Sequence, residues 1–247
     1  MTEIIENLQK GQSLSFEESK SLFSDLMEGK YEEDKIIEIL ESFIKKGETK
    51  DELAGGIFVL REKANKVKAD PETIDTCGTG GDGQNSLNIS TAAAIVLSSM
   101  GIKVAKHGNR SISSKSGSAD VLEAAGINLN ISPELISQCI EEIGLGFMFA
   151  PAHHSAMKHA IGPRKELAVR TIFNVLGPLT NPAKAPNQIM GVYDKSLVEP
   201  IANVLKGLNS RHVMGVHSED GLDEFSIANT TYVAELKDNN ISTYTVH

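Results

Sequence analysis

The stretch Asp75-Thr-Cys-Gly-Thr-Gly-Gly-Asp82-Gly83 decides how the chain is organised. Its four glycines suit neither a helix nor a strand, but they allow left-handed backbone and close approach of a ligand. Small polar residues, Asn88-Ile-Ser-Thr91, and an alanine-rich helical segment follow at once. A flexible turn that ends at a helix N-terminus presents unpaired N–H groups to an anion. The stretch therefore predicts a phosphate cradle, although a glycine-rich loop alone is a weak signal of function.

Length and composition exclude several classes of protein. The 247 residues have room for one large domain, or for a small and a medium one. The net charge of −9 disfavours broad binding to nucleic acid or to a membrane surface. No apolar run approaches the length of a bilayer span, and the acidic N-terminus does not resemble a signal peptide.

The two cysteines, Cys77 and Cys139, fit no metal-binding spacing. We interpret both as reduced thiols of a cytoplasmic protein. Cys77 lies within the glycine loop, but no base stands beside it in the sequence, which favours packing over nucleophilic catalysis.

The first seventy residues predict helices only. Capping boxes and glycine stops punctuate this region, at Ser15–Glu18, Gly29, Gly47 and Thr49–Glu52. Gly55 and Gly56, inside the last of these helices, allow the close approach of a neighbour, such as another subunit. We expect a small all-α domain over residues 1–70.

Strands alternate with helices after Pro71, which predicts an α/β domain over residues 71–247 with a largely parallel sheet. Helices are expected at 91–100, 117–125, 132–143 and 195–208, and strands at 103–105, 147–150, 188–193 and 212–217. The last segments, 232–236 and 241–246, are typical of a hairpin. A further helix would normally cover such a sheet, so we expect the C-terminal end of the domain to be missing from this chain.

A second polar loop runs from Lys106 to Asp120 and contains Arg110, Lys115 and several serines. It follows a predicted strand and precedes a predicted helix, which places it at the edge of the sheet where α/β proteins bind ligands. Hydroxyls bind phosphate oxygens and the cations neutralise charge. Two such loops make phosphate binding a better interpretation than a solvated loop.

Two further segments are ambiguous by themselves. Arg164 and Lys165 follow Gly162-Pro163 near an expected helix start, where cations oppose the helix dipole; a bound anion would explain them, or they are surface charges. Asp223 and Glu224 end an acidic turn, where they are either solvated or bind Mg²⁺ on phosphates.

The adjacent His153 and His154 lack helical i, i+4 spacing and have no neighbouring cysteine. Packing or lining of a substrate site is therefore favoured over a zinc site.

Taken together, the motifs resemble those of the anthranilate phosphoribosyltransferase family. The resemblance spans essentially the whole chain, and the motifs that carry it, in this order, are Gly78-Thr-Gly-Gly-Asp82, Asn88-Ile-Ser-Thr91, Lys106-His-Gly-Asn-Arg110, Lys115-Ser-Gly-Ser-Ala-Asp120 and Asn174-Val-Leu-Gly-Pro-Leu-Thr-Asn-Pro182. It implies a nucleoside-phosphorylase-like architecture, with a helical domain that forms a homodimer. It also implies transfer of the phosphoribosyl group of phosphoribosyl pyrophosphate to the amine of anthranilate, with Mg²⁺ as cofactor, in tryptophan biosynthesis.

The resemblance also implies site residues. Those lining the substrate sites would be Gly78, Gly81, Asp82, Ser86, Asn88, Ile89, Ser90, Thr91, Lys106, His107, Gly108, Asn109, Arg110, Ser111, Ile112, Ser113, Ser114, Ser118, His154 and Arg164. The Mg²⁺ ligands would be Ser90, Asp223 and Glu224. The catalytic group would be Lys106, Asn109 and Arg164, with Asn109 and Arg164 on anthranilate.

The chemistry agrees with this set of residues. Pyrophosphate departs as negative charge grows on it, and Mg²⁺, Lys106 and backbone amides can stabilise that charge. An aromatic amine is already a nucleophile, so a strong base is not required. The rival hypotheses are a pyrimidine nucleoside phosphorylase, an inactive truncated transferase, and a non-catalytic relative that binds nucleic acid or a partner; Arg164, Asn109 and the acidic pair favour the transferase.

Overall fold

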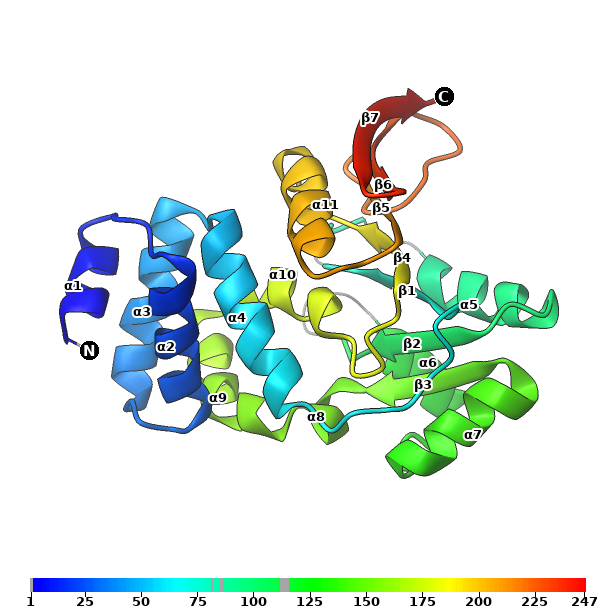
Figure 1. Cartoon of the computed structure of the whole chain (residues 1–247), viewed down its shortest axis with the longest axis horizontal. Helices are drawn as coiled ribbons and strands as arrows, with labels where there is room; N and C mark the ends of the chain where they lie inside the picture. The colour runs from blue at the N-terminus through cyan, green and yellow to red at the C-terminus, as the bar shows by residue number, and fades with distance from the viewer. Residues whose placement is uncertain (1, 81, 85–86, 112–115) are drawn as a thin grey trace. The chain divides into compact units, whose positions relative to one another are not determined.

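The computed structural model describes residues 2–80, 82–84, 87–111 and 116–247, and the chain divides into two compact units. One unit comprises Met1–Ala64 and His154–Thr180, and the other comprises Asn65–His153 and Asn181–His247 (Figure 1). The sequence predicts a boundary near residue 70, after the first helices. It does not anticipate that the later segment His154–Thr180 belongs to the helical unit.

The helical unit is built from short helices joined by tight turns. They are α1 (Thr2–Gln9), α2 (Phe16–Met27), α3 (Glu33–Lys46), α4 (Lys50–Lys63), η1 (Ser155–Met157), α9 (Lys158–Leu167), α10 (Ile172–Leu176) and η2 (Pro178–Thr180). Both expected capping boxes are present, at the starts of α2 and α4. Gly29 and Gly47 have φ of 71° and 82° just after α2 and α3, where the left-handed backbone stops each helix.

Aromatic packing explains why His154–Thr180 returns to this unit. The ring of Phe173, on α10, meets the ring of Phe23 edge-on with centroids 5.8 Å apart, and Phe23 also packs against Phe43 at 6.1 Å. All three rings are buried. Without α10, Phe23 would lose one of its two aromatic partners and the core around it would stay open.

Gly55 and Gly56 allow close approach of helices within the same chain, and this corrects the suggestion of another subunit. A Cβ at Gly55 would lie 2.7 Å from Ser19 Cβ of α2, and one at Gly56 would lie 3.1 Å from Leu176 of α10. The two glycines therefore serve the internal packing of α4.

Glu52 is a buried carboxylate that joins three parts of the helical unit. Its oxygens accept the backbone N–H groups of Leu14 and Thr49, each at 2.8 Å, and an ammonium N–H of Lys46 at 2.8 Å. Neither side chain of the ion pair is more than 9 % exposed. A buried carboxylate is tolerated only when its oxygens are satisfied in this way.

The second unit is an α/β layer built on one seven-stranded sheet. Its elements are β1 (Ile74–Gly78), α5 (Ile89–Ser99), β2 (Val104–Gly108), α6 (Ser118–Ala124), α7 (Pro133–Ile143), β3 (Leu145–Phe149), α8 (Ala150–His153), β4 (Asn187–Gly191), η3 (Lys195–Leu197), α11 (Val198–Gly207), β5 (His212–Ser218), β6 (Thr231–Lys237) and β7 (Asn240–Val246). The strand order is β3-β2-β1-β4-β5-β6-β7. The first five are mutually parallel, and β6 and β7 join antiparallel, as the expected hairpin.

Helices cover both faces of the sheet around β3. Met148 packs with Ile136 and Ile140 of α7, whereas Phe147 and Phe149 pack with α6 on the other face. Side chains alternate between faces along a strand, which explains the split. The α7 face of β3 is therefore buried, whereas its α6 face is only partly covered.

Two element boundaries, the end of β2 and the turn between β6 and β7, differ from those predicted from the sequence. The strand expected at 103–105 continues as β2 to Gly108, so Lys106 and His107 belong to the sheet and not to the loop that follows. At the β6–β7 turn, Asp238 and Asn239 have φ of 48° and 60°. Two consecutive positive φ values are typical of the tight turn that joins twisted antiparallel strands.

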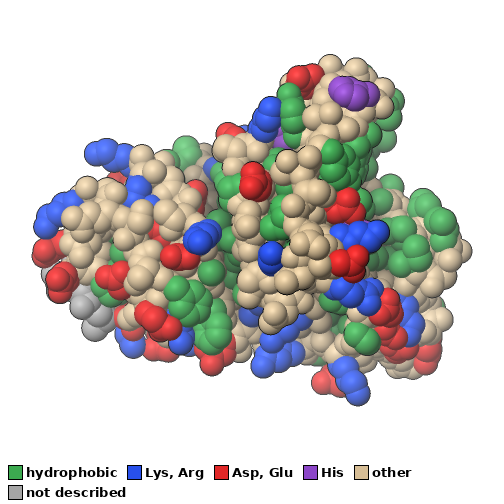
Figure 2. All heavy atoms as spheres, turned by 45° about the horizontal axis from the view of Figure 1, so that its top comes forward, with side chains coloured by type: hydrophobic (Ala, Val, Ile, Leu, Met, Phe, Trp, Pro, Cys, Tyr) green, Lys and Arg blue, Asp and Glu red, His purple; other side chains and the backbone are tan. Residues whose placement is uncertain are grey.

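The surface is mixed in charge. Figure 2 shows acidic and basic side chains interspersed over the visible face. No helix among the described residues is both long and apolar enough to cross a bilayer.

We expect Glu52→Gln to destabilise the helical unit strongly. The buried Lys46 ammonium would lose its counter-charge, and removal of one partner of a buried ion pair lowers the free energy of unfolding by about 3–5 kcal/mol. Chemical denaturation monitored by circular dichroism measures this change. Glu38→Gln is the matched control, because the Glu38–Lys35 pair is exposed and should change stability much less. Equal losses in the two variants would contradict a special role for Glu52.

Candidate functional site

The site is set by the topology of the parallel strands. The chain runs from β1 outward to β2 and β3, and then returns to the other side of β1 as β4. Ligands of open α/β sheets bind at the carboxyl ends of the strands, where the order reverses in this way. The glycine loop follows β1, the loop after Gly108 follows β2, and the acidic turn follows β5. Motifs far apart in sequence therefore meet at one edge.

The glycine loop is tied to the acidic turn. Asp223 Oδ2 accepts the backbone N–H of Gly80 at 3.0 Å, and Gln84 Nε2 donates to Asp220 O at 2.9 Å. A Cβ at Gly78 would lie 3.0 Å from Asp223 Oδ2, and one at Gly191 only 1.6 Å from Asp223 O. The paired ends of β1 and β4, Gly78 and Gly191, thus leave the space that the acidic turn fills.

Lys106 brings a buried positive charge to this edge. Its ammonium donates to Thr76 O of β1 and, at 3.3 Å, to Ser90 Oγ at the start of α5. Only 2 % of the residue is exposed. Burial lowers the pKa of Lys106, while the Asp75 carboxylate opposes that shift.

The carboxylates of the acidic turn are crowded and poorly hydrated. Burial, reinforced by the negative charge of Asp223, raises the pKa of Glu224 to about 7, against the effects of Lys106 and a Ser90 backbone hydrogen bond. Burial and Asp82 likewise raise the pKa of Asp223. Asp82 Oδ2 is buried without a hydrogen-bond partner among the described residues. A cation at this edge would relieve all three groups.

The described residues contain no ready cage of three or more His, Cys, Asp or Glu side chains for a metal ion. The donors that lie together are the Ser90 hydroxyl and the Asp223 and Glu224 carboxylates. Such an oxygen set suits Mg²⁺, which usually keeps water and substrate phosphates as its remaining ligands. The residues present therefore fit Mg²⁺ carried with a phosphate substrate.

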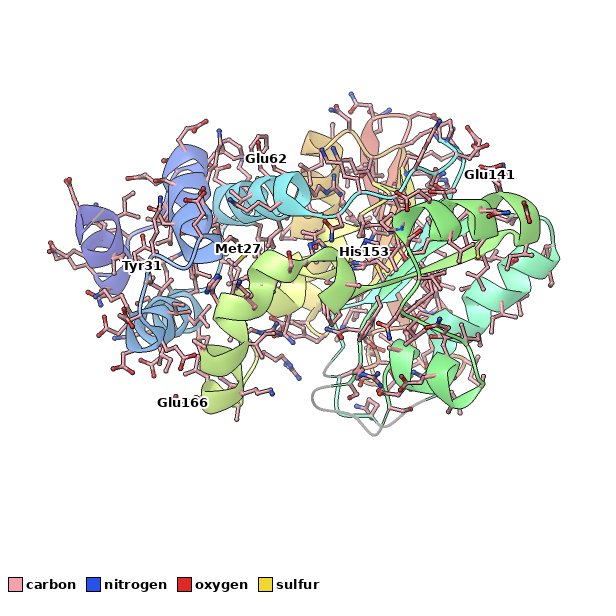
Figure 3. All side chains as sticks on the ribbon, turned by 90° about the horizontal axis from the view of Figure 1, so that it is seen from below. Met27, Tyr31, Glu62, Glu141, His153 and Glu166 are labelled. Carbon is pink, nitrogen blue, oxygen red and sulfur yellow. The ribbon has the colours of Figure 1, made fainter. Side chains whose placement is uncertain are left out.

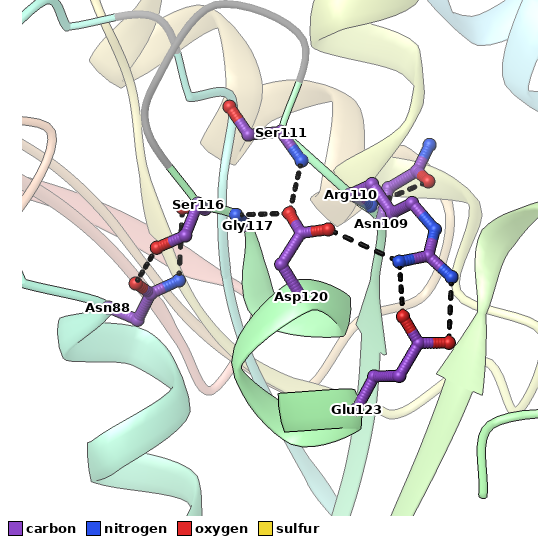
Figure 4. A network of polar contacts seen from close by, with 8 residues as sticks. All are labelled: Asn88, Asn109, Arg110, Ser111, Ser116, Gly117, Asp120 and Glu123. Carbon is purple, nitrogen blue, oxygen red and sulfur yellow. Dashed lines mark hydrogen bonds and ion pairs between the residues drawn. The ribbon is translucent and has the colours of Figure 1, made fainter. Parts of the chain in front are cut away.

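The second polar loop is held at its two ends by α6. Figure 4 shows the Asp120 carboxylate accepting the backbone N–H of Ser111 at 3.0 Å and of Gly117 at 2.7 Å. At Gly117, a Cβ would lie 2.5 Å from the Ser111 nitrogen, so the two ends of the loop are in close contact. A carboxylate that satisfies both N–H groups fixes the mouth of this loop.

The two polar loops are joined to each other. Asn88 exchanges hydrogen bonds with Ser116, donating to its carbonyl at 3.3 Å and accepting from its hydroxyl at 3.1 Å (Figure 4). Thr91 Oγ1 donates to Ser118 Oγ at 3.0 Å. The structure thus brings the predicted residues of the glycine-loop helix, α5, against those that start α6.

Arg110 is already paired with carboxylates. Its guanidinium makes two bonds with Glu123, at 2.7 and 3.0 Å, and one with Asp120 at 3.3 Å (Figure 4). It also lies over the Phe149 ring at 5.5 Å. The side chain therefore braces the start of α6, and its charge is shared with two anions. Asn109, its neighbour, is exposed after the end of β2.

Arg164 lies in the helical unit, and its position corrects the sequence argument. Residues 162–165 are inside α9, and Arg164 and Lys165 occupy its last turn. Cations are favourable at a helix C-terminus, so no anion is needed to explain them. The Arg164 guanidinium lies 5.5 Å from the centre of the Phe173 ring, and burial lowers its pKa. No carboxylate pairs with it among the described residues.

Ile89 is the first of the remaining predicted residues; it begins α5 and is 37 % exposed. His107 and Gly108 end β2, and His154 is buried at the start of the returning segment of the helical unit. His153, labelled in Figure 3, packs through Nδ1 against Asn65 O at 2.7 Å. Five predicted residues lie outside the described part of the chain: Gly81, Ser86, Ile112, Ser113 and Ser114.

Sequence reasoning overlooked Asp75, Asn181 and Gly191. Asp75 and Asn181 are buried and bonded to each other at 2.8 Å beneath the site. The available signal was an acidic residue within the buried strand Ile74–Gly78, because a buried carboxylate requires partners. Cys77 beside it is buried, with its pKa raised well above the usual range by burial, which agrees with a packing role.

Comparison with protein families defines the class of the protein. The helical bundle domain of a glycosyl transferase family matches residues 2–64, and the a/b domain of the same family matches residues 70–247. The chain is therefore a glycosyltransferase in which a helical bundle accompanies an α/β domain.

Individual relatives narrow this class. Anthranilate phosphoribosyltransferase of Ruthia magnifica subsp. Calyptogena magnifica is 58 % identical, over 98 % of this chain and 72 % of the relative. The enzyme of Hydrogenovibrio crunogenus is 53 % identical, over 100 % of this chain and 73 % of the relative. The Thermus thermophilus enzyme structure matches with a TM-score of 0.91 at 38 % identity, over 98 % of this chain and 72 % of that one. A Saccharomyces cerevisiae enzyme structure, in complex with PRPP and Mg, matches with a TM-score of 0.79 at 30 % identity, over 99 % of this chain and 65 % of that one. This chain belongs to the anthranilate phosphoribosyltransferase family, which confirms the resemblance drawn from the motifs.

Gly191→Ala is expected to disturb the acidic turn. The new Cβ would lie 1.6 Å from Asp223 O, so the backbone of the turn must move. We expect the free energy of unfolding to fall by about 3 kcal/mol, and Tm by about 6–12 °C, measured by calorimetry. Gly207→Ala is the control, because nothing lies within 4 Å of its Cβ at the end of α11. A Gly191 variant as stable as the Gly207 variant would contradict this packing.

Proposed function

We propose that this chain transfers the phosphoribosyl group of phosphoribosyl pyrophosphate to the amine of anthranilate at the carboxyl edge of the parallel sheet. The observation that carries the assignment is the convergence of the glycine loop, Lys106 and the Asp223–Glu224 pair at the ends of β1, β2 and β5. One edge then offers backbone amides, a buried cation and oxygen ligands to a magnesium–pyrophosphate group.

Phosphate recognition falls to residues of the α/β unit. The backbone of the glycine loop and the start of α5, with Asn88, Ser90 and Thr91, would donate hydrogen bonds to phosphate oxygens. Ser90, Asp223 and Glu224 would hold Mg²⁺. When bound, this ion neutralises the charge of the pyrophosphate. The complex of the Saccharomyces cerevisiae enzyme with PRPP and Mg supports this assignment.

Lys106 would stabilise the leaving group. Negative charge grows on the pyrophosphate as its bond to the ribose breaks, and a fixed ammonium in poorly hydrated surroundings favours that charge strongly. Because Lys106 is held by Thr76 and Ser90, its ammonium needs little reorganisation during the reaction. We therefore assign most of the catalysis to charge stabilisation and positioning.

Anthranilate recognition is assigned to Arg164 and Asn109, and His107 and His154 are assigned as further residues that line a substrate site. A guanidinium without a carboxylate partner can bind the carboxylate of anthranilate in a bidentate manner. Such binding would orient the amine toward the anomeric carbon. The amine is a neutral nucleophile, so this assignment requires no general base.

The overall activity has a direct test. Anthranilate is fluorescent, and its fluorescence should disappear when phosphoribosyl pyrophosphate and Mg²⁺ are added together to the protein. Persistence of the fluorescence under these conditions would contradict the proposed reaction, and omission of either reagent is the control.

Arg164→Ala should raise the KM for anthranilate about 10- to 100-fold, the equivalent of one charge-assisted interaction. The KM for phosphoribosyl pyrophosphate should change far less, and steady-state kinetics with each substrate varied in turn measures both. Lys165→Ala is the matched control, because Lys165 is an exposed neighbour on the same helix turn. Equal effects on the two KM values would remove Arg164 from this role.

Binding of Mg²⁺ should weaken as the pH falls through 7. Glu224 has a pKa of about 7, above the ordinary 4.5, so its carboxylate is mostly ionised at pH 8 and mostly protonated at pH 6. We expect the apparent affinity for Mg²⁺ with phosphoribosyl pyrophosphate to fall roughly tenfold between these values. Calorimetry at both pH values measures it. In Glu224→Gln most of this pH dependence should disappear; an unchanged dependence would exclude Glu224 as its source.

We further propose a cytoplasmic homodimer that associates through the helical unit. Support comes from the apolar side chains Ile44 and Phe58, which are 43 % and 41 % exposed on α3 and α4. Sedimentation of the wild type and of Phe58→Ser tests the assignment, and a monomeric wild type would contradict it.

A further inference from the structure

The pairing of β1 with β2 stops unusually early. Only Ile74 and Val104 are in register between these strands, whereas β1 pairs with β4, and β2 with β3, through five residues each. In a regular parallel ladder the next pair would be Thr76 and Lys106. In that pair the Thr76 N–H would donate to Ala105 O, and the His107 N–H would donate to Thr76 O.

Side chains occupy the places of this missing pair. The His107 N–H donates to Asp75 Oδ1 at 3.1 Å, and Asn181 Nδ2 donates to Ala105 O at 2.8 Å. Thr76 O accepts the Lys106 ammonium. Three backbone groups that would have bonded the two strands are thus satisfied by three side chains, as buried backbone groups require.

Asp75 and Asn181 form one rigid unit in the gap. Asn181 Nδ2 also donates to Asp75 Oδ2 at 2.8 Å, and Asn181 Oδ1 accepts the Ala183 N–H at 2.8 Å. Asp75 is fully buried and Asn181 is 3 % exposed. Both ends of the amide are therefore fixed, and it cannot turn without leaving a buried group unpaired.

We propose that Asp75 and Asn181 are positioning residues, which hold β1 and β2 apart so that the Lys106 ammonium is fixed at Thr76 O and Ser90 Oγ. If the strands closed into a regular ladder, the His107 N–H would take Thr76 O, and Lys106 would lose that partner. The buried Asp75 carboxylate also interacts electrostatically with the Lys106 ammonium and is its counter-charge within the protein. The inference rests on the proposed role of Lys106 in the reaction.

A double-mutant cycle tests whether Asp75 acts through Lys106. Asp75→Asn keeps the side-chain shape, but sets its amide donor against either the His107 N–H or the Asn181 amide, both of which donate to the Asp75 carboxylate. We expect kcat/KM for phosphoribosyl pyrophosphate to fall about 10- to 100-fold, as for a misplaced catalytic group, with little change in the KM for anthranilate. In a Lys106→Met background, Asp75→Asn should have no further effect. Full additivity of the two losses would overturn the inference.

Matched controls separate positioning from general damage to the sheet. Asn187 Nδ2 donates to Thr73 O at 3.0 Å, so Asn187→Ala removes an asparagine bond to the backbone preceding β1, at the opposite end of the strand. This variant should retain the wild-type kcat/KM, and a loss as large as that of Asp75→Asn would overturn the inference. If Asp75→Asn does not fold, Asn181→Ala, which leaves the carboxylate in place, carries the same cycle.

A crystal structure of Asp75→Ala, which removes the acceptor of the His107 N–H, gives a readout that does not depend on activity. It is expected to show the His107 N–H bonded to Thr76 O and the Lys106 ammonium displaced; an unmoved ammonium would overturn the inference. Failure of wild-type turnover would instead contradict the proposed function, so the two failures are distinguishable.

Discussion

Burial of one ammonium group beside several carboxylates is the constraint on which the α/β unit depends. Lys106 is almost inaccessible to water, and a buried charge is tolerated only when its surroundings satisfy it. Asp75 lies below it, Ser90 contacts it, and Asp223 and Glu224 face the same edge. The carboxylates outnumber the single ammonium at this edge, so a substrate that brings its own cation balances their charge. Burial, reinforced by the negative charge of Asp223, raises the pKa of Glu224 although a lysine lies nearby.

The motif loops and the class of fold could be predicted from sequence because both follow from local rules. Glycines mark the loop after β1, serines and cations mark the loop after β2, and alternation of strands and helices implies parallel strands whose carboxyl ends converge. The capping boxes of α2 and α4 are equally local, since each depends on residues three apart. Convergence at one edge then follows from topology.

Features that depend on distant packing could not be read from the sequence in the same way. Nothing near Phe173 indicates that its ring meets Phe23, so the return of residues 154–180 to the helical unit was missed. The interrupted β1–β2 ladder was missed because Asn181 is more than one hundred residues from Asp75 along the chain. For Arg164 the error was a helix boundary: Gly162-Pro163 suggested a start, but α9 continues through it.

The divided composition of the helical unit also bears on how the chain folds as it is synthesised. The first four helices emerge early, but α10, which closes their core on Phe23, follows more than one hundred residues later. The first four helices are therefore made before Phe173, and their apolar core stays open while most of the α/β unit is made. Domains usually fold in order from the N-terminus, and exposed apolar surface in such intermediates invites aggregation. The N-terminal helices of this chain therefore stay incompletely packed until residue 173 has been made, and their apolar surface is open to chaperones during translation.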